Sequence, residues 1–219
     1  MSTQVLRCAD APVPIALAAQ PTSQTDTIPD VAVIDELLPT LAANSPPRLI
    51  VLGGDAALAV VLTHLMRTER LHVEIGFVPP ERSHAVQAYQ LNTGNTAAKC
   101  ALEGTPAEAP LVRDDTGTVL VGRAEITGVD DARLAGEAYV DDVRLFSGQV
   151  GSMVVTPTLE LPGVRAGVPR RFRRNNWTAG RAVQLGTPGA VISRDGVRSA
   201  RSVPRASFYR YHQPWLLVR

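Results

Sequence analysis

The chain has 219 residues and is almost neutral, with 22 Lys and Arg residues against 21 Asp and Glu residues. Its content of 45% hydrophobic and 20% charged residues is that of an ordinary globular protein, and its length allows one or two domains with a substantial core. No apolar segment approaches the length of a membrane-spanning helix, which excludes an integral protein of that kind and leaves only peripheral membrane contact.

The first part of the chain predicts a strand followed by a helix. Alternate apolar residues favour a strand over Val13 to Ala18. Apolar residues at helical spacing then predict a helix, which Pro39 is expected to kink or divide; they are Val31, Ile34, Leu38 and Leu41. Because another strand follows, the order is typical of a crossover unit in a parallel sheet.

The first half of the chain is organised around the stretch from Arg48 to Met66. Leu49 to Leu52 is a short apolar run, as expected of a strand buried on both faces of a parallel sheet. Gly53 and Gly54 allow a sharp turn and a close approach to a ligand, because neither has a Cβ atom. The helix predicted after this turn has one core face, formed by Leu58, Val61, Leu62 and Leu65.

The start of that helix is a candidate anion site. Its first amides are unpaired, so an anion such as a phosphate is favoured there. Asp55 has two roles open to it: it caps the helix, or it faces the crevice and acts on phosphate chemistry through a metal or as a base.

A second strand and turn follow. His72 to Val78 predicts another buried strand, and Glu81 to Gln90 forms a long connection expected at the crevice rim. Thr93-Gly94-Asn95 predicts a turn that leads into a helix over Thr96 to Leu102, with Asn95 as its N-cap.

A change of composition near Glu103 to Pro110 marks the predicted domain boundary. We expect an α/β domain with a parallel sheet over residues 1–106, which the resemblance described below implies to be nucleotide-binding, and an all-β, β-sandwich-like domain over residues 107–219. The second domain is indicated by short β-rich runs separated by turns. These runs are Val119 to Val121, Arg123 to Ile126, Glu137 to Val140, Val143 to Phe146, Gly151 to Val155, Arg181 to Leu185, Ala190 to Ile192 and Trp215 to Val218.

The charges are unevenly distributed. Residues 1–110 have a net charge of −5 and residues 111–219 a net charge of +6, with the densest basic run at Arg170-Arg171-Phe172-Arg173-Arg174. A basic C-terminal half suits an anionic partner, although arginines of this kind also form the polar face of a sheet. Nucleic acid is not an expected partner, because the arginines lack interleaved aromatic residues and a known binding module.

The two cysteines indicate the cellular compartment in which the protein is expected. Cys8 and Cys100 lie in unlike contexts without metal-ligand spacing, which favours a reduced, cytoplasmic protein. A monomer and a homodimer are both left open.

Two motifs resemble those of a known enzyme family. Gly53-Gly54-Asp55 resembles the Gly-Gly-Asp-Gly signature of diacylglycerol kinases, sphingosine kinases and NAD kinases. The segment Leu91 to Ala98 resembles the Pro-Leu-Gly-Thr-Gly-Asn-Asp-Phe-Ala loop of the same family, which contacts nucleotide. The order and separation of the two motifs match the lipid kinase branch.

The resemblance implies transfer of the ATP γ-phosphate to a lipid hydroxyl, with Mg²⁺ neutralising the developing charge. It implies that Asp55 is catalytic, and that the backbone around the two motifs holds the nucleotide. The acceptor would be a lipid at an anionic membrane surface, where each nearby basic residue adds about 1 kcal/mol. The residues that would hold the metal are not indicated, and the implied nucleotide-binding residues are Gly53, Gly54, Ala56, Thr93, Gly94 and Asn95.

Departures from the family pattern keep a second function open. Ala56 replaces the last Gly of the first signature, Asn92 replaces the first Gly of the second, and Thr96 replaces its Asp. Asp195-Gly196 resembles the start of a C-terminal Asp-Gly-Glu motif, but Val197 stands where the family has its catalytic glutamate. The alternative is therefore a catalytically degenerate relative that binds nucleotide or lipid as a regulatory module.

Two further points complete the comparison with the family. Asp114, Asp115 and Glu125 are the candidates for the acid that the family carries after its second loop. The downstream Asn-Glu pair of NAD kinases has no counterpart, which disfavours that activity. Asp195-Gly196 also has a simpler interpretation as a hairpin turn.

Overall fold

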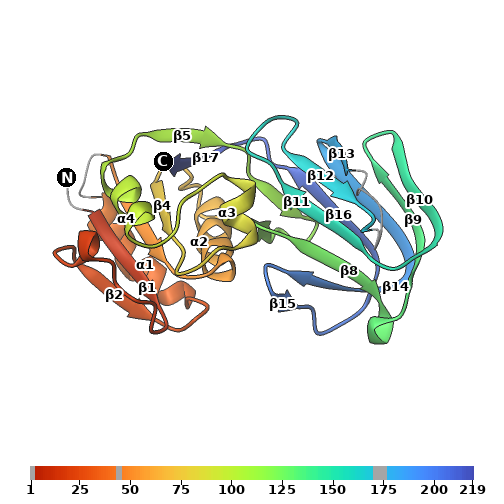
Figure 1. Cartoon of the computed structure of the whole chain (residues 1–219), viewed down its shortest axis with the longest axis horizontal. Coiled ribbons are helices and arrows are strands. Elements are labelled where there is room, and N and C mark those ends of the chain that lie inside the picture. The colour runs from red at the N-terminus through yellow and green to blue at the C-terminus, as the bar shows by residue number, and fades with distance from the viewer. Residues whose placement is uncertain (1–2, 43–45, 170–176) are drawn as a thin grey trace. The chain divides into compact units, whose positions relative to one another are not determined.

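A computed structural model describes residues 3–42, 46–169 and 177–219 (Figure 1). The chain forms two compact units, one made of residues 1–109 with 213–219 and the other of residues 110–212. None of the helices in the described part of the chain has the length and apolar content of a membrane span.

The first unit is built on a six-stranded sheet with the order β2-β1-β3-β4-β17-β5. Every neighbouring pair is parallel except β17 and β5, which are antiparallel. The predicted α/β domain with a parallel sheet is thereby confirmed. The strands are β1 (Thr3–Cys8), β2 (Thr22–Thr25), β3 (Arg48–Leu52), β4 (Glu74–Val78), β5 (Pro106–Ala109) and β17 (Trp215–Val218).

Four α-helices and a short 3-10 helix accompany this sheet. Both β3 and β4 are buried along their whole length, as their apolar sequences require. Gly76 in β4 lets the last helix pack closely, because a Cβ there would lie 2.6 Å from the Cβ of Ala101. The helices are η1 (Ile15–Leu17), α1 (Val31–Ala42), α2 (Asp55–Arg67), α3 (His84–Ala88) and α4 (Gly94–Glu103).

A buried ion pair ties two strands of this sheet to the end of α4. The Nη2 atom of Arg48 lies 2.7 Å from Oε2 of Glu74, with the two side chains only 10% and 6% exposed. Arg48 also donates to the carbonyl oxygens of Leu102 at 2.6 Å and Gly104 at 3.1 Å. The guanidinium therefore satisfies helix-terminal carbonyls that would otherwise lack donors.

The second unit is an eleven-stranded, antiparallel sheet assembly, which confirms the predicted β-rich domain. Its longest strand, β14, pairs with β8, β9, β15 and β16 around one apolar core. The strands are β6 (Val112–Asp114), β7 (Val119–Leu120), β8 (Ala124–Gly128), β9 (Leu134–Val140), β10 (Val143–Val150), β11 (Met153–Pro157), β12 (Val164–Gly167), β13 (Trp177–Gly180), β14 (Ala182–Arg194), β15 (Val197–Arg198) and β16 (Val203–Arg210), with a 3-10 turn η2 (Val129–Asp131).

Three expectations need correction. The strand predicted over Val13 to Ala18 is wrong: η1 lies there, and the first strand is β1, Thr3–Cys8. Pro39 lies inside α1, which continues through it as one helix, so the division expected as one alternative is wrong. Trp215–Val218 is a strand as predicted, but it pairs with β4 and β5 of the first unit rather than with the second domain. The basic run at positions 170–174 lies outside the described residues.

Candidate functional site

The two signature segments follow neighbouring parallel strands and meet at the end of β4. The amide of Gly53, just after β3, donates to the carbonyl oxygen of Val78 at 3.3 Å. The amide of Gly94, at the start of α4, donates to the carbonyl oxygen of Pro79 at 3.3 Å. Gly94 has a φ of +58°, a conformation that glycine adopts most easily. Both bends are thus fixed to the same strand end.

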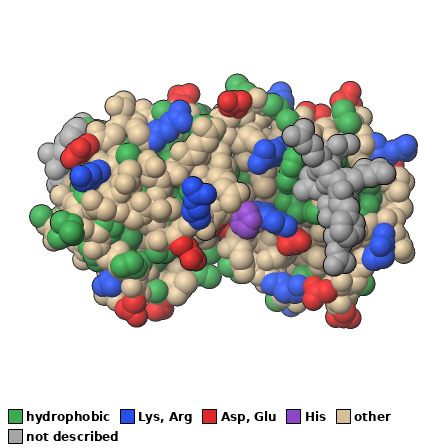
Figure 2. Space-filling model, in the orientation of Figure 1, with side chains coloured by type: hydrophobic (Ala, Val, Ile, Leu, Met, Phe, Trp, Pro, Cys, Tyr) green, Lys and Arg blue, Asp and Glu red, His purple; other side chains and the backbone are tan. Residues whose placement is uncertain are grey.

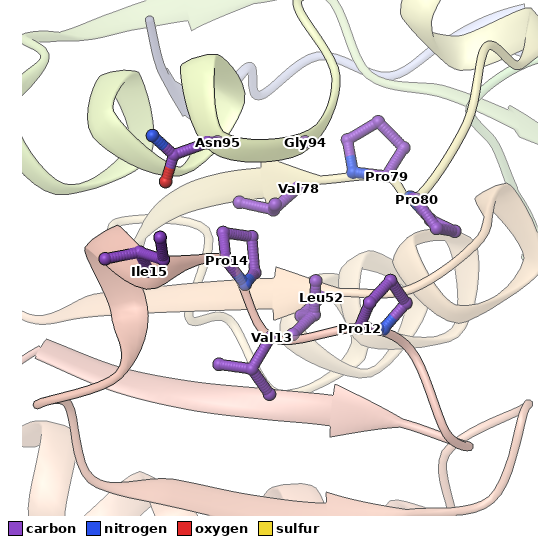
Figure 3. A pocket seen from close by; sticks show the side chains of 10 residues that line it. All are labelled: Pro12, Val13, Pro14, Ile15, Leu52, Val78, Pro79, Pro80, Gly94 and Asn95. Carbon is purple, nitrogen blue, oxygen red and sulfur yellow. The ribbon is translucent and has the colours of Figure 1, made fainter.

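A cavity of about 370 Å³ opens at this edge of the sheet (Figure 3). Figure 3 shows the loop after β1 on one side and Gly94 and Asn95 of α4 on the other, with the ends of β3 and β4 behind them. Its ten lining residues are Pro12, Val13, Pro14, Ile15, Leu52, Val78, Pro79, Pro80, Gly94 and Asn95. Of the residues implied by the resemblance, only Gly94 and Asn95 line it.

The two adjacent glycines have different surroundings. Gly53 is buried, and a Cβ there would lie 2.8 Å from the Cβ of Cys8 in β1. Gly54 is exposed, and a Cβ there would meet nothing within 4 Å. Packing against β1 therefore explains Gly53, whereas only an approaching ligand would distinguish glycine from alanine at Gly54.

This difference gives a matched pair of variants. We expect Gly53→Ala to lower the free energy of unfolding by about 1–3 kcal/mol, because the methyl group overpacks against β1. Gly54→Ala is expected to leave the unfolding midpoint unchanged, because its methyl group projects into open space before the helix. It is expected to weaken nucleotide binding, because the methyl group occupies space that an approaching phosphate would need. Denaturant unfolding and nucleotide titration measure the two effects. Equal stability of the two variants would contradict the packing argument.

Asp55 does not cap its own helix. Gly54 is the N-cap of α2, and Oδ2 of Asp55 accepts from the amide of Ala85 in α3 at 3.1 Å. That amide is held in place by α3, whose N-cap Ser83 accepts from the amide of Val86 at 3.2 Å. Oδ1 of Asp55 is buried and has no hydrogen-bond partner among the described residues. The capping role expected for α2 is thus wrong, and one carboxylate oxygen is left for a ligand.

The amides left for an anion are those at the start of α2. Because Gly53 and Gly94 already donate to carbonyl oxygens, their amides are occupied. The first-turn amides of Gly54, Asp55 and Ala56 in α2 have no acceptor among the described residues, as expected at a helix N-terminus.

Asn95 joins α4 to the loop that covers the cavity. Its Oδ1 accepts from the amide of Ala16 in η1 at 3.2 Å. The helix α4 begins at Gly94 with Thr93 as the N-cap, and no side chain caps it. The predicted capping by Asn95 is therefore wrong; the side chain instead positions the Pro12–Ile15 wall of the cavity.

In the second unit, Asp195 is used structurally. Asp195 and Gly196 have φ values of 48° and 86° and turn the chain between β14 and β15, which confirms the hairpin interpretation. The Asp195 carboxylate accepts from three consecutive amides, those of residues 121 to 123, at 2.8–3.1 Å. Val197, which stands where the resembling motif has its glutamate, lies in β15 and is 46% exposed.

Two of the three candidate acids of this unit have structural partners, whereas Asp115 is exposed. Asp114 is fully buried, with its Oδ2 2.5 Å from Nε of Arg194, and it accepts from the amides of Thr116 and Thr118. Glu125 lies 3.3 Å from Arg123. These contacts account for both carboxylates without a ligand.

The cysteine behind the Gly53 turn is chemically protected. Burial raises the pKa of the Cys8 thiol to about 11, whereas Cys100 is only half-buried. Because the thiolate is the nucleophile, we expect iodoacetamide at pH 8 to label Cys100 and to spare Cys8 until the chain is denatured. Peptide mass spectrometry measures the two sites, and equal labelling of both in the folded protein would contradict the burial of Cys8.

Comparisons with known proteins show which solved structures have a similar fold. No protein-family model matches the sequence, and no curated protein matches it. A diacylglycerol kinase structure from Bacillus anthracis strain Sterne has 12% identity and a TM-score of 0.75, with 99% of this chain and 96% of that chain covered. An NAD kinase from Archaeoglobus fulgidus, solved with ATP, has 13% identity and a TM-score of 0.63, with 99% and 93% covered. The chain therefore has the two-domain fold that these kinases share.

Proposed function

We propose that this protein is a nucleotide-dependent phosphotransferase of the diacylglycerol kinase type, which moves the ATP γ-phosphate to a lipid hydroxyl. The observation that carries the proposal is the meeting of two bends at the carboxyl ends of the adjacent parallel strands β3 and β4, beside a cavity of about 370 Å³. Crevices at this edge of open parallel sheets are where such folds bind ligands.

The helix starts supply the contacts for phosphate. The free first-turn amides of α2, together with the partial positive charge of the helix end, favour the phosphate oxygens. The start of α4 lines the cavity with Gly94 and Asn95 and adds a second helix end. Fixed donors of this kind stabilise charge that develops during transfer without having to reorganise.

Asp55 fits the requirements for a magnesium nucleotide. The described residues contain no group of three His, Cys, Asp or Glu side chains that would hold a metal alone. Mg²⁺ is usually held by one or two carboxylates together with substrate phosphates, and the unpartnered Oδ1 of Asp55 offers one such ligand. When bound, Mg²⁺ would neutralise charge on the transferring phosphate.

Proton transfer is the alternative role for Oδ1 of Asp55, which takes it in place of binding the metal. With Oδ2 held by Ala85, Oδ1 is the atom that would accept the proton of the lipid hydroxyl as its oxygen attacks the γ-phosphorus and ADP leaves. The hydroxyl oxygen thereby gains the phosphoryl group, and the proton moves to the carboxylate.

A lipid acceptor is supported by the fold and by the charge of the second unit. The second unit, residues 110–212, has 15 basic and 10 acidic side chains and therefore a net charge of +5, which favours an anionic membrane surface. On the face shown in Figure 2, basic side chains are spread singly among acidic ones, so we expect a weak, salt-sensitive attraction rather than tight docking.

A second candidate is a nucleotide-binding relative without catalysis. The specific observation in its favour is that no acidic side chain is present at position 197, and that the carboxylate of Asp195 already accepts from three backbone amides. In that case the crevice of the first unit would bind nucleotide and the protein would act as a regulatory module.

A single experiment separates the two. The protein is incubated with labelled ATP and Mg²⁺ on mixed micelles that contain diacylglycerol, and the rise in melting temperature with ATP is measured in parallel. Label in the lipid supports the kinase. A rise in melting temperature without label supports the binding module, and neither signal would overturn both functions.

A further inference from the structure

The cavity beside the two bends is almost entirely apolar. Nine of its ten lining residues are proline, aliphatic or glycine, and Asn95 is the one polar side chain among them. Its volume of about 370 Å³ lies in the range of small-molecule sites. A ligand part that enters here is therefore held by shape and apolar contact.

The backbone of this lining has few groups for reading a base edge. Four lining residues are prolines, which have no N–H group: Pro12, Pro14, Pro79 and Pro80. The amide of Gly94 donates to Pro79, and Leu52 and Val78 belong to paired strands. The carbonyl oxygens of Val78, Pro79 and Pro14 accept from Gly53, Gly94 and Leu17. Hydrogen bonds within the fold thus occupy many of the backbone N–H and C=O groups of the wall.

The polar side chain of the wall is also engaged. Oδ1 of Asn95 accepts from the amide of Ala16, which leaves its Nδ2 as the one free side-chain donor of the lining among the described residues. A single donor meets an acceptor on adenine and on guanine alike. Selection between the two bases requires a patterned set of donors and acceptors, which the side chains of this wall do not present.

The mouth of the cavity presents apolar surface to solvent. Ile15 is 89% exposed and Val13 is 41% exposed, and both belong to the loop that Asn95 positions. Covering such surface with a flat ligand is favourable, because it removes apolar area from water. Because Asn95 and Gly94 also begin α4, an anionic group held at that helix end has its neighbouring apolar part beside this mouth.

We propose that the cavity holds the nucleoside part of the nucleotide by apolar contact with the proline-rich wall, and that the site therefore accepts adenine and guanine nucleotides almost equally. This inference rests on the proposed nucleotide-dependent function and adds its substrate class: a purine nucleoside triphosphate without base selection.

The test compares three ligands on the intact protein. Dissociation constants for ATP, GTP and inorganic triphosphate are measured by calorimetry in the presence of Mg²⁺. We expect ATP and GTP to agree within about tenfold and both to bind at least about tenfold more tightly than triphosphate. A preference of more than about tenfold for either nucleotide, or triphosphate binding as tightly as ATP, would overturn the inference while leaving nucleotide binding established. Binding of none of the three would instead overturn the proposed function.

A pair of exposed isoleucines tests where the nucleoside lies. Ile15→Ser removes apolar surface at the mouth and is expected to weaken ATP and GTP binding by the same factor, about threefold to tenfold, without changing triphosphate binding. Ile28→Ser is the control, because Ile28 is 43% exposed in the same unit and does not line the cavity. Unchanged ATP and GTP affinities in Ile15→Ser, or an equal loss in both variants, would contradict the placement.

Discussion

Asp55→Asn is expected to lower phosphoryl transfer to lipid by about 10² to 10⁴-fold while leaving the melting temperature almost unchanged. The carboxamide oxygen still accepts from the amide of Ala85, which Oδ2 of Asp55 does at 3.1 Å, so the contact with α3 survives. The substitution removes the charge and basicity of Oδ1, the atom without a partner among the described residues. Label transfer from ATP measures the first effect, and thermal unfolding measures the second.

Asp26→Asn serves as the matched control. Asp26 is an exposed carboxylate in the same unit, outside the crevice lining, so its loss should change neither transfer nor melting temperature. Full activity of Asp55→Asn would remove Asp55 from the mechanism. A fall in activity accompanied by a large fall in melting temperature would assign Asp55 to the fold instead.

Arg48→Met is expected to give the largest loss of stability, about 3–5 kcal/mol in the free energy of unfolding. It leaves Glu74, whose side chain is 6% exposed, as a buried charge without its guanidinium partner. It also removes the donors to the Leu102 and Gly104 carbonyl oxygens at the end of α4. Denaturant unfolding at constant pH measures the loss.

Two comparisons separate the buried charge from other effects. Arg82→Met changes an exposed arginine and is expected to alter stability by less than about 0.5 kcal/mol. The double variant Arg48→Met with Glu74→Met should recover part of the loss, because an apolar pair replaces the unpaired charge. A double variant less stable than Arg48→Met would show that the carbonyl contacts dominate.

The centre of the first unit could be predicted from the sequence because its signals agree. A β-branched apolar run, two glycines and helical spacing place β3 and α2 to within a residue or two. The strand expected over Val13 to Ala18 failed because its alternation of apolar residues came from a cavity wall, where Pro12 and Pro14 favour a loop and a 3-10 turn.

Long-range pairing could not be predicted. The run Trp215 to Val218 has a clear strand composition, but composition does not indicate which sheet a strand joins. Its partners are Glu74 and Ile75 in β4 and the residues of β5, far away in the sequence. The change of composition near Pro110 indicated where the second unit begins but not that the chain returns to the first.

The candidate site could be located but not detailed. Gly53-Gly54-Asp55 and Thr93-Gly94-Asn95 fixed its position, and both segments lie at the end of β4. The partners of Asp55 and Asn95 were missed because each contact depends on a loop that packs back on the crevice, through Ala85 and Ala16. The prolines of the cavity wall carried the only sequence signal for its apolar character.

The position of β17 has a consequence for synthesis on the ribosome. The gap between β4 and β5 is closed by a strand that the ribosome makes only after the whole of the second unit. Until then β4 exposes an unpaired edge of apolar sequence, which is a template for pairing with other chains. The crevice at the ends of β3 and β4 therefore lies in a unit that is completed last although most of it is translated first.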